Sequence, residues 1–254
     1  MRAVFLFVAA AALLGGALFA RAPATLVDTR VAAATGDRLR LSDARGTIWE
    51  GAGVLRLGDS ATGQPIAWRA DPLSLFTGTV AVALGPASGQ LRSTARVAPS
   101  RLELRQLDFI EVPVDALARS FAPGIPPPQG VLRIAIARLA IDATTISGQA
   151  TLTWHGASLP EMAGGAPLRL GSVTAVLAER DGGLGGPLRG SGDDVESTGA
   201  LTWHPSGVTS IDVTLTPRAG LPRERQATVE ATLARYGRPD GRGGYRITLP
   251  GSAG

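Results

Sequence analysis

The chain has 254 residues, enough to bury a hydrophobic core without the support of disulfides or structural metals. It contains no Cys, which excludes a disulfide framework, a thiol nucleophile and a Cys-ligated metal. The formal net charge is only +4, and the sequence contains no Lys. The Arg residues are spread singly along the chain rather than gathered in a basic block, so we expect no nucleic-acid partner.

The N-terminal residues form an uninterrupted apolar stretch from Ala3 to Ala20, between Arg2 and Arg21. This stretch meets the lower limit for a transmembrane helix, about 17 residues, and exceeds the usual apolar region of a signal peptide. We predict a single-pass membrane anchor over residues 1–22. The alternative is a signal peptide that is cleaved after Ala20, and both interpretations place the body outside the cytoplasm.

The rest of the chain shows short runs of Val, Ile, Leu and Thr that alternate with polar or small residues and end at Gly or Pro. This alternation is typical of half-buried β-strands. It predicts an all-β body of mainly antiparallel, open and curved sheet with two or three short helices. The predicted strands are 38–41, 53–57, 66–69, 79–84, 101–105, 131–136, 148–154, 171–177, 199–203, 209–216 and 244–249.

Two segments between the predicted strands have helical signals. Asp71 and Pro72 begin a short run that ends at Gly78, which predicts a single helical turn. Residues 223–236 contain good helix formers, with apolar side chains at a spacing of three and four, and Gly237 follows as the C-cap. The second segment is the stronger helix prediction.

Two further segments predict the organisation of the body. Residues 123–130 include three consecutive Pro residues and predict a stiff connection between a first β-rich half, residues 23–122, and a second half, residues 131–254. Residues 181–192 contain six Gly and one Pro, and this composition predicts a mobile surface loop.

Few residues of the chain suggest chemistry. The two His residues, His155 and His204, each follow a Trp at the end of a predicted strand, which favours a packing role over catalysis. Asp193, Asp194 and Glu196 could bind a hard cation, but they lack the spacing of a calcium loop, so a solvated turn is predicted. We therefore predict no catalytic residue, no metal site, no cofactor and no enzymatic activity.

The large aromatic side chains and the turns have a recognisable order. The block from Gly46 to Gly51 places Trp49 between glycines, and Trp68 precedes a turn from Asp71 to Gly78. Towards the end of the sequence, residues 233–241 read Leu-Ala-Arg-Tyr-Gly-Arg-Pro-Asp-Gly. We predict that the four Trp residues, at positions 49, 68, 154 and 203, pack the sheet.

Together with the N-terminal apolar stretch, these blocks resemble the type II secretion system protein N family, also called general secretion pathway protein N. The chain departs from the family pattern at Tyr236, where a small aliphatic residue is expected, and in its Gly-rich segment. The residues of the chain that match the motifs, for which the resemblance implies a structural role, are Gly46, Thr47, Trp49, Gly51, Trp68, Pro72, Leu73, Gly237, Pro239 and Asp240.

The resemblance implies an accessory subunit of the machine that carries folded proteins from the periplasm across the outer membrane of bacteria. It implies a location in the inner membrane with the body in the periplasm, and partners among the other secretion subunits there. Edge strands and the Gly-rich segment are the expected contact sites, because unpaired strand edges accept added strands. The alternative function is a lipid- or ligand-binding β module, in which an apolar sheet face holds a lipid chain.

Overall fold

The computed structural model describes residues 21–35, 37, 39–57, 63–98, 100–115, 127–142, 144–160, 166–204 and 209–249. The chain divides into two compact units, Met1–Arg92 and Ser93–Gly254. The predicted membrane anchor from Ala3 to Ala20 lies outside the described residues. Of the helices that the structure does describe, none combines the length and the apolar character that a membrane span requires.

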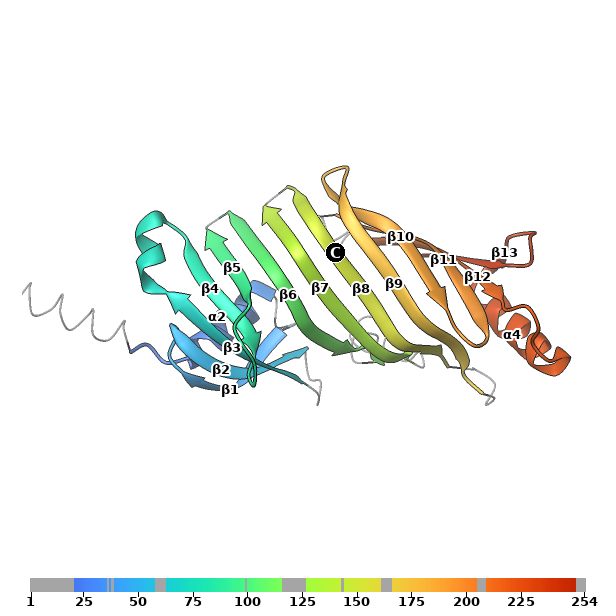
Figure 1. Cartoon of the computed structure of the whole chain (residues 1–254), viewed down its shortest axis with the longest axis horizontal. Helices are drawn as coiled ribbons and strands as arrows, with labels where there is room; N and C mark the ends of the chain where they lie inside the picture. Colours follow the sequence, from blue (N-terminus) through green and yellow to red (C-terminus); the bar gives the residue numbers. More distant parts are fainter. Residues whose placement is uncertain are drawn as a thin grey trace, which may run out of the picture. The chain divides into compact units, whose positions relative to one another are not determined.

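In its described residues, the first unit is an antiparallel sheet whose strands follow one another in chain order, together with an α-helix and a 3-10 turn (Figure 1). Its core gathers Leu41, Trp68 and Ala24, with Ile66 and Leu84 packed against them. The α-helix is not predicted from the sequence. The elements are α2 (Thr25–Thr35), β1 (Leu39–Gly46), β2 (Glu50–Leu57), β3 (Gly63–Asp71), η1 (Pro72–Thr77) and β4 (Val80–Pro86).

The second unit is a longer antiparallel meander. Each strand from β5 to β11 pairs with the next strand along the chain, β12 pairs with β14, and β13 pairs with the other side of β14. The predicted all-β, mainly antiparallel fold is therefore confirmed. The elements are β5 (Ser93–Ala98), β6 (Arg101–Pro113), β7 (Gln129–Asp142), β8 (Ile146–Leu159), β9 (Leu168–Arg180), β10 (Gly183–Ser191), β11 (Val195–Trp203), β12 (Thr209–Pro217), α4 (Arg223–Tyr236), β13 (Arg238–Pro239) and β14 (Tyr245–Leu249).

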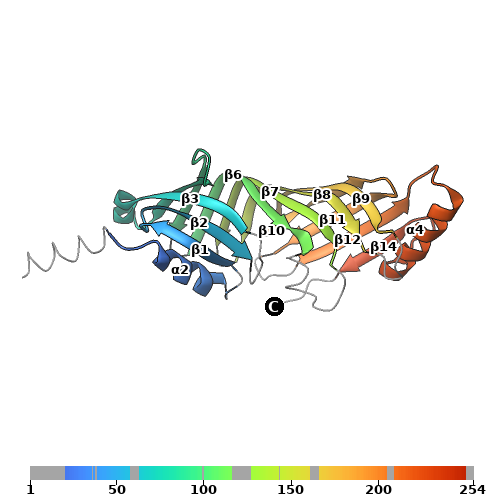
Figure 2. The same cartoon turned by 90° about the horizontal axis from the view of Figure 1, so that it is seen from below.

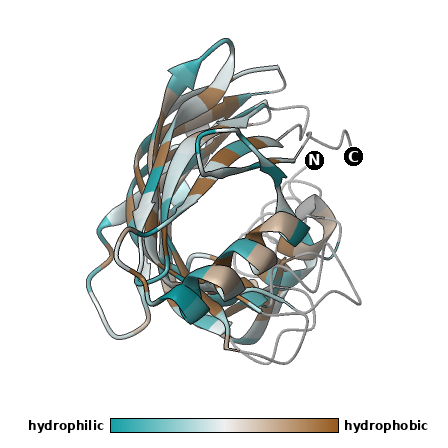
Figure 3. Cartoon of the chain, turned by 90° about the vertical axis from the view of Figure 1, so that its right-hand side faces the viewer, coloured by the Kyte–Doolittle hydropathy of each residue, from teal (hydrophilic) through white to brown (hydrophobic). Residues whose placement is uncertain are grey.

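The sheet of the second unit has a core face and a polar face, because side chains alternate along each strand. The core face contains two buried clusters of apolar side chains, one over β6 to β10 and one over β8, β9, β11 and β12. Brown and teal residues alternate along the strands in Figure 3. Trp154 and Trp203 pack partly buried against these clusters, and Trp68 is buried in the first unit, as predicted for these three residues.

Helix α4 lies alongside β12 and β14 (Figure 2) and closes the second of these clusters. Val229 and Leu233 of α4 are fully buried against side chains that include Val195 and Leu215 of the sheet. The predicted helix over 223–236 is confirmed, with Gly237 as its C-cap. The amide of Gly237 donates to the Leu233 carbonyl at 2.9 Å, while its own backbone is extended rather than left-handed.

The prediction of a mobile loop over residues 181–192 is wrong, because most of this segment is strand β10. Asp181 and Gly182, with φ of 50° and 74°, form a two-residue turn of the hairpin between β9 and β10. Two positive φ values are what the turn between twisted strands requires, and Asp-Gly is a favoured sequence for it. Gly186 stands where a Cβ would collide with the Val176 carbonyl oxygen, so its presence reflects close backbone approach rather than disorder.

The predicted stiff connection at 123–130 lies mostly outside the described residues. Strands β6 and β7, which precede and follow it, pair with each other within the second unit, from Arg101 opposite Asp142 to Pro113 opposite Val131. The predicted division of the body at this connection stays a prediction.

Candidate interaction surfaces

The block from Gly46 to Gly51 forms the turn between β1 and β2. Gly46 has a φ of 90°, and a Cβ there would collide with the Glu50 carbonyl oxygen. The Thr47 hydroxyl accepts the amides of Trp49 at 3.2 Å and Glu50 at 3.1 Å. A Cβ on Gly51 would meet the indole ring of Trp68, which is 5% exposed. The hydrogen bonds of the turn and the missing side chains of its glycines therefore leave space for the indole ring of Trp68 to be buried.

This turn also holds the chain that leads into it from the N-terminus. The Ala24 amide donates to the Gly46 carbonyl at 3.1 Å, and the Ile48 amide donates to the Ala22 carbonyl at 3.0 Å. The Trp68 indole N–H donates to the Ile48 carbonyl at 3.3 Å. The turn thus fixes the residues that directly follow the predicted anchor. The Trp49 carbonyl accepts the Ala70 amide of β3 at 2.6 Å.

Strand β1 is an edge strand, and helix α2 occupies part of its free side. The Asp28 carboxylate accepts the Leu41 amide at 2.7 Å and pairs with Arg40 at 2.9 Å. The Arg40 hydrogen bond and the Leu41 amide lower the pKa of Asp28. Because backbone groups near both ends of β1 already have partners outside the sheet, this edge is a poor template for an added strand.

The predicted single turn after β3 is present as the 3-10 helix η1. The Leu73 amide donates to the Asp71 carboxylate at 3.0 Å, and the Ala81 amide donates to the Ser74 hydroxyl at 2.9 Å. These two bonds tie the turn, which Pro72 begins, to the strands on either side. Leu73 is nevertheless 71% exposed, so this motif residue contributes little to the core.

The closing motif residues Gly237, Pro239 and Asp240 shape the other end of the chain. The Asp240 carboxylate accepts the amides of Arg242 at 2.7 Å and Gly244 at 2.9 Å, and these bonds lower its pKa. A Cβ on Gly237 would lie 2.8 Å from the Arg246 carbonyl oxygen. The tight turn limits β13 to Arg238 and Pro239, opposite Arg246 and Tyr245.

The short β13 leaves much of β14 without a second neighbour. Ile247 and Thr248 of β14 pair with β12 on one side. On their other side, the part of the chain that the structure describes supplies no strand. Pro239 has no amide hydrogen and cannot extend the ladder by donating from that position. Among the described residues, this edge of the second unit therefore has no added strand at Ile247 and Thr248, whereas backbone groups at the edge of β1 already have partners.

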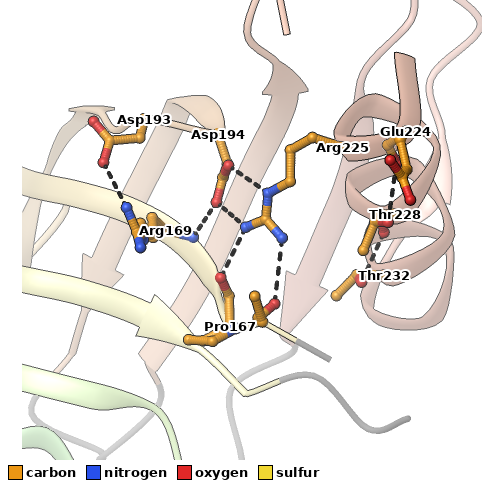
Figure 4. Close-up of polar contacts among 9 residues, drawn as sticks. Pro167, Arg169, Asp193, Asp194, Glu224, Arg225, Thr228 and Thr232 are labelled. Atoms are coloured by element: carbon orange, nitrogen blue, oxygen red, sulfur yellow. Dashed lines mark hydrogen bonds and ion pairs between the residues drawn. The ribbon is translucent and has the colours of Figure 1, made fainter. Parts of the chain in front are cut away.

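A buried ion pair fastens α4 to the sheet (Figure 4). Arg225 of α4 donates to the Asp194 carboxylate through Nε at 2.9 Å and also through its terminal nitrogen. It further donates to the Pro167 carbonyl at 2.9 Å, and the Arg169 amide donates to Asp194 at 2.7 Å. Burial raises the pKa of Asp194, but the bonds from Arg225 and Arg169 outweigh it, so the pKa is lowered.

The predicted solvated turn is therefore wrong for Asp194, which is 4% exposed, although Asp193 and Glu196 are exposed. Sequence reasoning missed the pairing because Arg225 lies 31 residues further along the chain. Among the described residues, no group of three or more acidic, His or Cys side chains could hold a metal ion. His155 is exposed on β8 and His204 directly follows β11.

The sequence was also compared with known proteins. A family model described as type II secretion system (T2SS), protein N, matches residues 37–248. No curated protein and no solved structure matches the chain.

Proposed function

Because the chain belongs to the type II secretion system protein N family, we propose that it is an accessory subunit of that system, anchored in the inner membrane with its body in the periplasm. The family supports a component of the secretion system. The apolar stretch from Ala3 to Ala20 supports the anchor. Anchoring confines the body to the membrane surface and raises its effective concentration against neighbouring subunits, so weak contacts suffice.

The open edge of β14 is the observation that supports a role in assembly. Strand addition uses backbone hydrogen bonds for affinity and alternate side chains for specificity. The edge of β1 is occupied by α2 and Asp28, whereas Ile247 and Thr248 belong to a strand with one neighbouring strand at these positions in the described part of the chain. In this proposal a strand of another secretion subunit pairs with β14.

The absence of Cys from the sequence permits a direct test with single-Cys variants. Thr248→Cys places a thiol on the exposed polar face of the edge strand β14, and Thr198→Cys places one on the same face of the central strand β11. We expect zero-length or short crosslinks to other secretion subunits in native membranes from the Thr248→Cys variant only. Equal crosslinking from both positions, or none from either, would contradict docking at this edge.

The anchor is tested separately by comparing the full chain with a variant that lacks residues 1–21. We expect the full chain in the inner-membrane fraction, with secretion subunits recovered by crosslinking. The shortened chain is expected neither to associate with the membrane nor to crosslink to secretion subunits. Membrane association of the shortened chain would contradict the anchor. Mass spectrometry of the purified body checks the alternative function, because lipid bound to the body without any secretion subunit would favour a lipid-binding module.

A further inference from the structure

Four arginines lie close together on the polar face of β5, β6 and β7. Arg96 of β5 is directly opposite Glu103 of β6, and Arg105 of β6 is directly opposite Arg138 of β7. Arg101 is the fourth, at the start of β6. We call Arg96, Arg101, Arg105 and Arg138 the arginine face. All four are exposed, and Arg101 and Arg105 expose 48% and 51% of their side chains.

The carboxylates near the arginine face do not balance its charge. Glu103 pairs with Arg101 at 3.0 Å and with Arg105 at 3.7 Å, so one carboxylate is shared by two arginines. Asp142 lies opposite Arg101 but accepts the hydroxyl and amide of Thr145 and the amide of Thr144 instead. These bonds lower the pKa of Asp142 to about 2 and hold its carboxylate in its own turn.

Arg96 and Arg138 have no ion-pair partner among the carboxylates that the structure describes. Arg138 also faces a second arginine, Arg105, directly across the two strands. Like charges directly opposite one another destabilise an antiparallel pair, since their Cβ atoms are only about 5 Å apart. Glu103 pairs with Arg105 but not with Arg138, so the described side chains relieve this unfavourable contact only in part. A ligand with negative charge would relieve it.

The chemistry of the arginine face specifies the ligand further. Guanidinium groups form planar forks that bind carboxylates in a bidentate manner, and two forks across neighbouring strands can hold adjacent carboxylates. Surfaces that bind anionic membranes instead combine basic residues with large apolar side chains that insert between lipids. Here the polar-face neighbours are small or polar, namely Thr94, Ala98, Ala140, Ser147 and Gln149.

We propose that the arginine face binds an acidic segment of another secretion-system protein. This inference rests on the proposed function and specifies the charge of one partner. The charges on the arginine face fix the alignment of the acidic segment as well as attracting it. A partner carboxylate opposite Glu103 is disfavoured, while one between Arg105 and Arg138 is favoured.

The test uses the purified full chain in detergent and a fluorescent oligoglutamate peptide, with an oligoglutamine peptide of equal length as the uncharged probe. We expect binding of oligoglutamate only, weakening between about 50 mM and 200 mM salt. The double variant Arg105→Gln/Arg138→Gln is expected to lose about tenfold in affinity or more. Arg105→Lys/Arg138→Lys, which keeps the charge but not the forks, is expected to lose about threefold.

The matched control is Arg133→Gln/Arg189→Gln, which removes two exposed arginines from β7 and β10 of the same sheet outside the arginine face. Its affinity for oligoglutamate is expected to change by less than about twofold. Equal losses of affinity in this control and in Arg105→Gln/Arg138→Gln would overturn the proposal. Failure of the wild type to bind oligoglutamate would also overturn it. Phosphatidylglycerol vesicles are the second probe. If the protein binds these vesicles but not oligoglutamate, and if this binding is lost in Arg105→Gln/Arg138→Gln, the ligand of the arginine face is a membrane surface and the proposal is overturned.

These outcomes are separable from those of the Thr248→Cys experiment. Crosslinks at β14 without binding of oligoglutamate would leave the secretion role standing and remove the arginine face from it. Thermal unfolding of the double variants completes the test. A role confined to folding predicts a lower melting temperature for Arg105→Gln/Arg138→Gln, whereas removal of a repulsive pair predicts an equal or higher one.

Discussion

At the scale of single residues, Asp194 is a buried charge whose removal is expected to lower stability strongly. It is buried and takes hydrogen bonds from Arg225 and Arg169, so its removal leaves a guanidinium without its main partner. We expect Asp194→Asn to lower the free energy of unfolding by about 3 kcal/mol. Asp193→Asn, at the exposed neighbour, is expected to change it by less than about 0.5 kcal/mol. Urea unfolding of both variants measures the difference, and equal effects would refute the role of the pair.

The same carboxylate gives a pH dependence with a definite sign. The pKa of Asp194 is lowered on folding, so its contribution is complete above the unfolded value of about 3.9 and is lost as the pH falls through the folded pKa. We therefore expect the stability difference between the wild type and Asp194→Asn to be constant near neutral pH and to shrink below about pH 4. Unfolding measured from pH 7 to pH 3 checks this, and a difference that grows with acid would contradict it.

At the scale of single elements, α4 depends on its buried face. Leu233 is fully buried, and we expect Leu233→Ala to cost about 2 to 5 kcal/mol through lost burial and the cavity left behind. Leu73→Ala removes the same atoms from the 71% exposed side chain on η1 and serves as the matched control, with an expected change under about 0.5 kcal/mol. Similar losses in the two variants, measured by chemical unfolding, would show that α4 is not held by this contact.

Strand β10 offers a sharper comparison between adjacent glycines. A Cβ on Gly186 would collide with the backbone of β9, which cannot give way without breaking the sheet, so we expect Gly186→Ala to cost about 1 to 3 kcal/mol. A Cβ on Gly185 would meet side-chain rather than backbone atoms, the nearest being in Thr202 at 3.3 Å and Arg180 at 3.4 Å. Gly185→Ala is therefore expected to stay within about 0.5 kcal/mol of the wild type, by the same unfolding measurement.

The strands and helices show how far the sequence predicts this fold. Strands in which apolar side chains alternate with polar or small ones, such as 131–136 and 148–154, were predictable because each buries one face. Strand β10 was not predictable, because its glycines allow the close approach of the β9 backbone and no local sequence pattern encodes that approach. Helix α2 has no amphipathic pattern that would predict it, and its partner Arg40 lies beyond the helix itself.

At the scale of the whole molecule, the candidate surfaces were less predictable than the fold. The family motifs identified turns, but the pairing of Arg105 with Arg138 depends on the register of two strands that are separated in the sequence by the Pro-rich segment. The open edge of β14 depends on β13 being only two residues long. Contacts of this kind follow from tertiary placement, and propensity or periodicity carries no information on them.

Protection from hydrogen exchange is expected to vary across the molecule. Strands β7, β8 and β9 each have two neighbours over much of their length and supply most of one buried cluster. Their amides are expected to exchange most slowly, while those of η1 and of the turn at Asp240 exchange fastest. Hydrogen–deuterium exchange with mass spectrometry measures this order. Fast exchange throughout β8 would contradict it.

The meander order of the second unit has a consequence for how the chain acquires its structure. Because each strand from β6 to β12 pairs with its predecessor, nearly every long strand of the unit finds its partner already available in the preceding sequence. Contact order is low for a β protein of this kind, which favours rapid folding. A chain that emerges N-terminus first can therefore add one strand at a time, and each new strand pairs with the edge that its predecessor has left exposed.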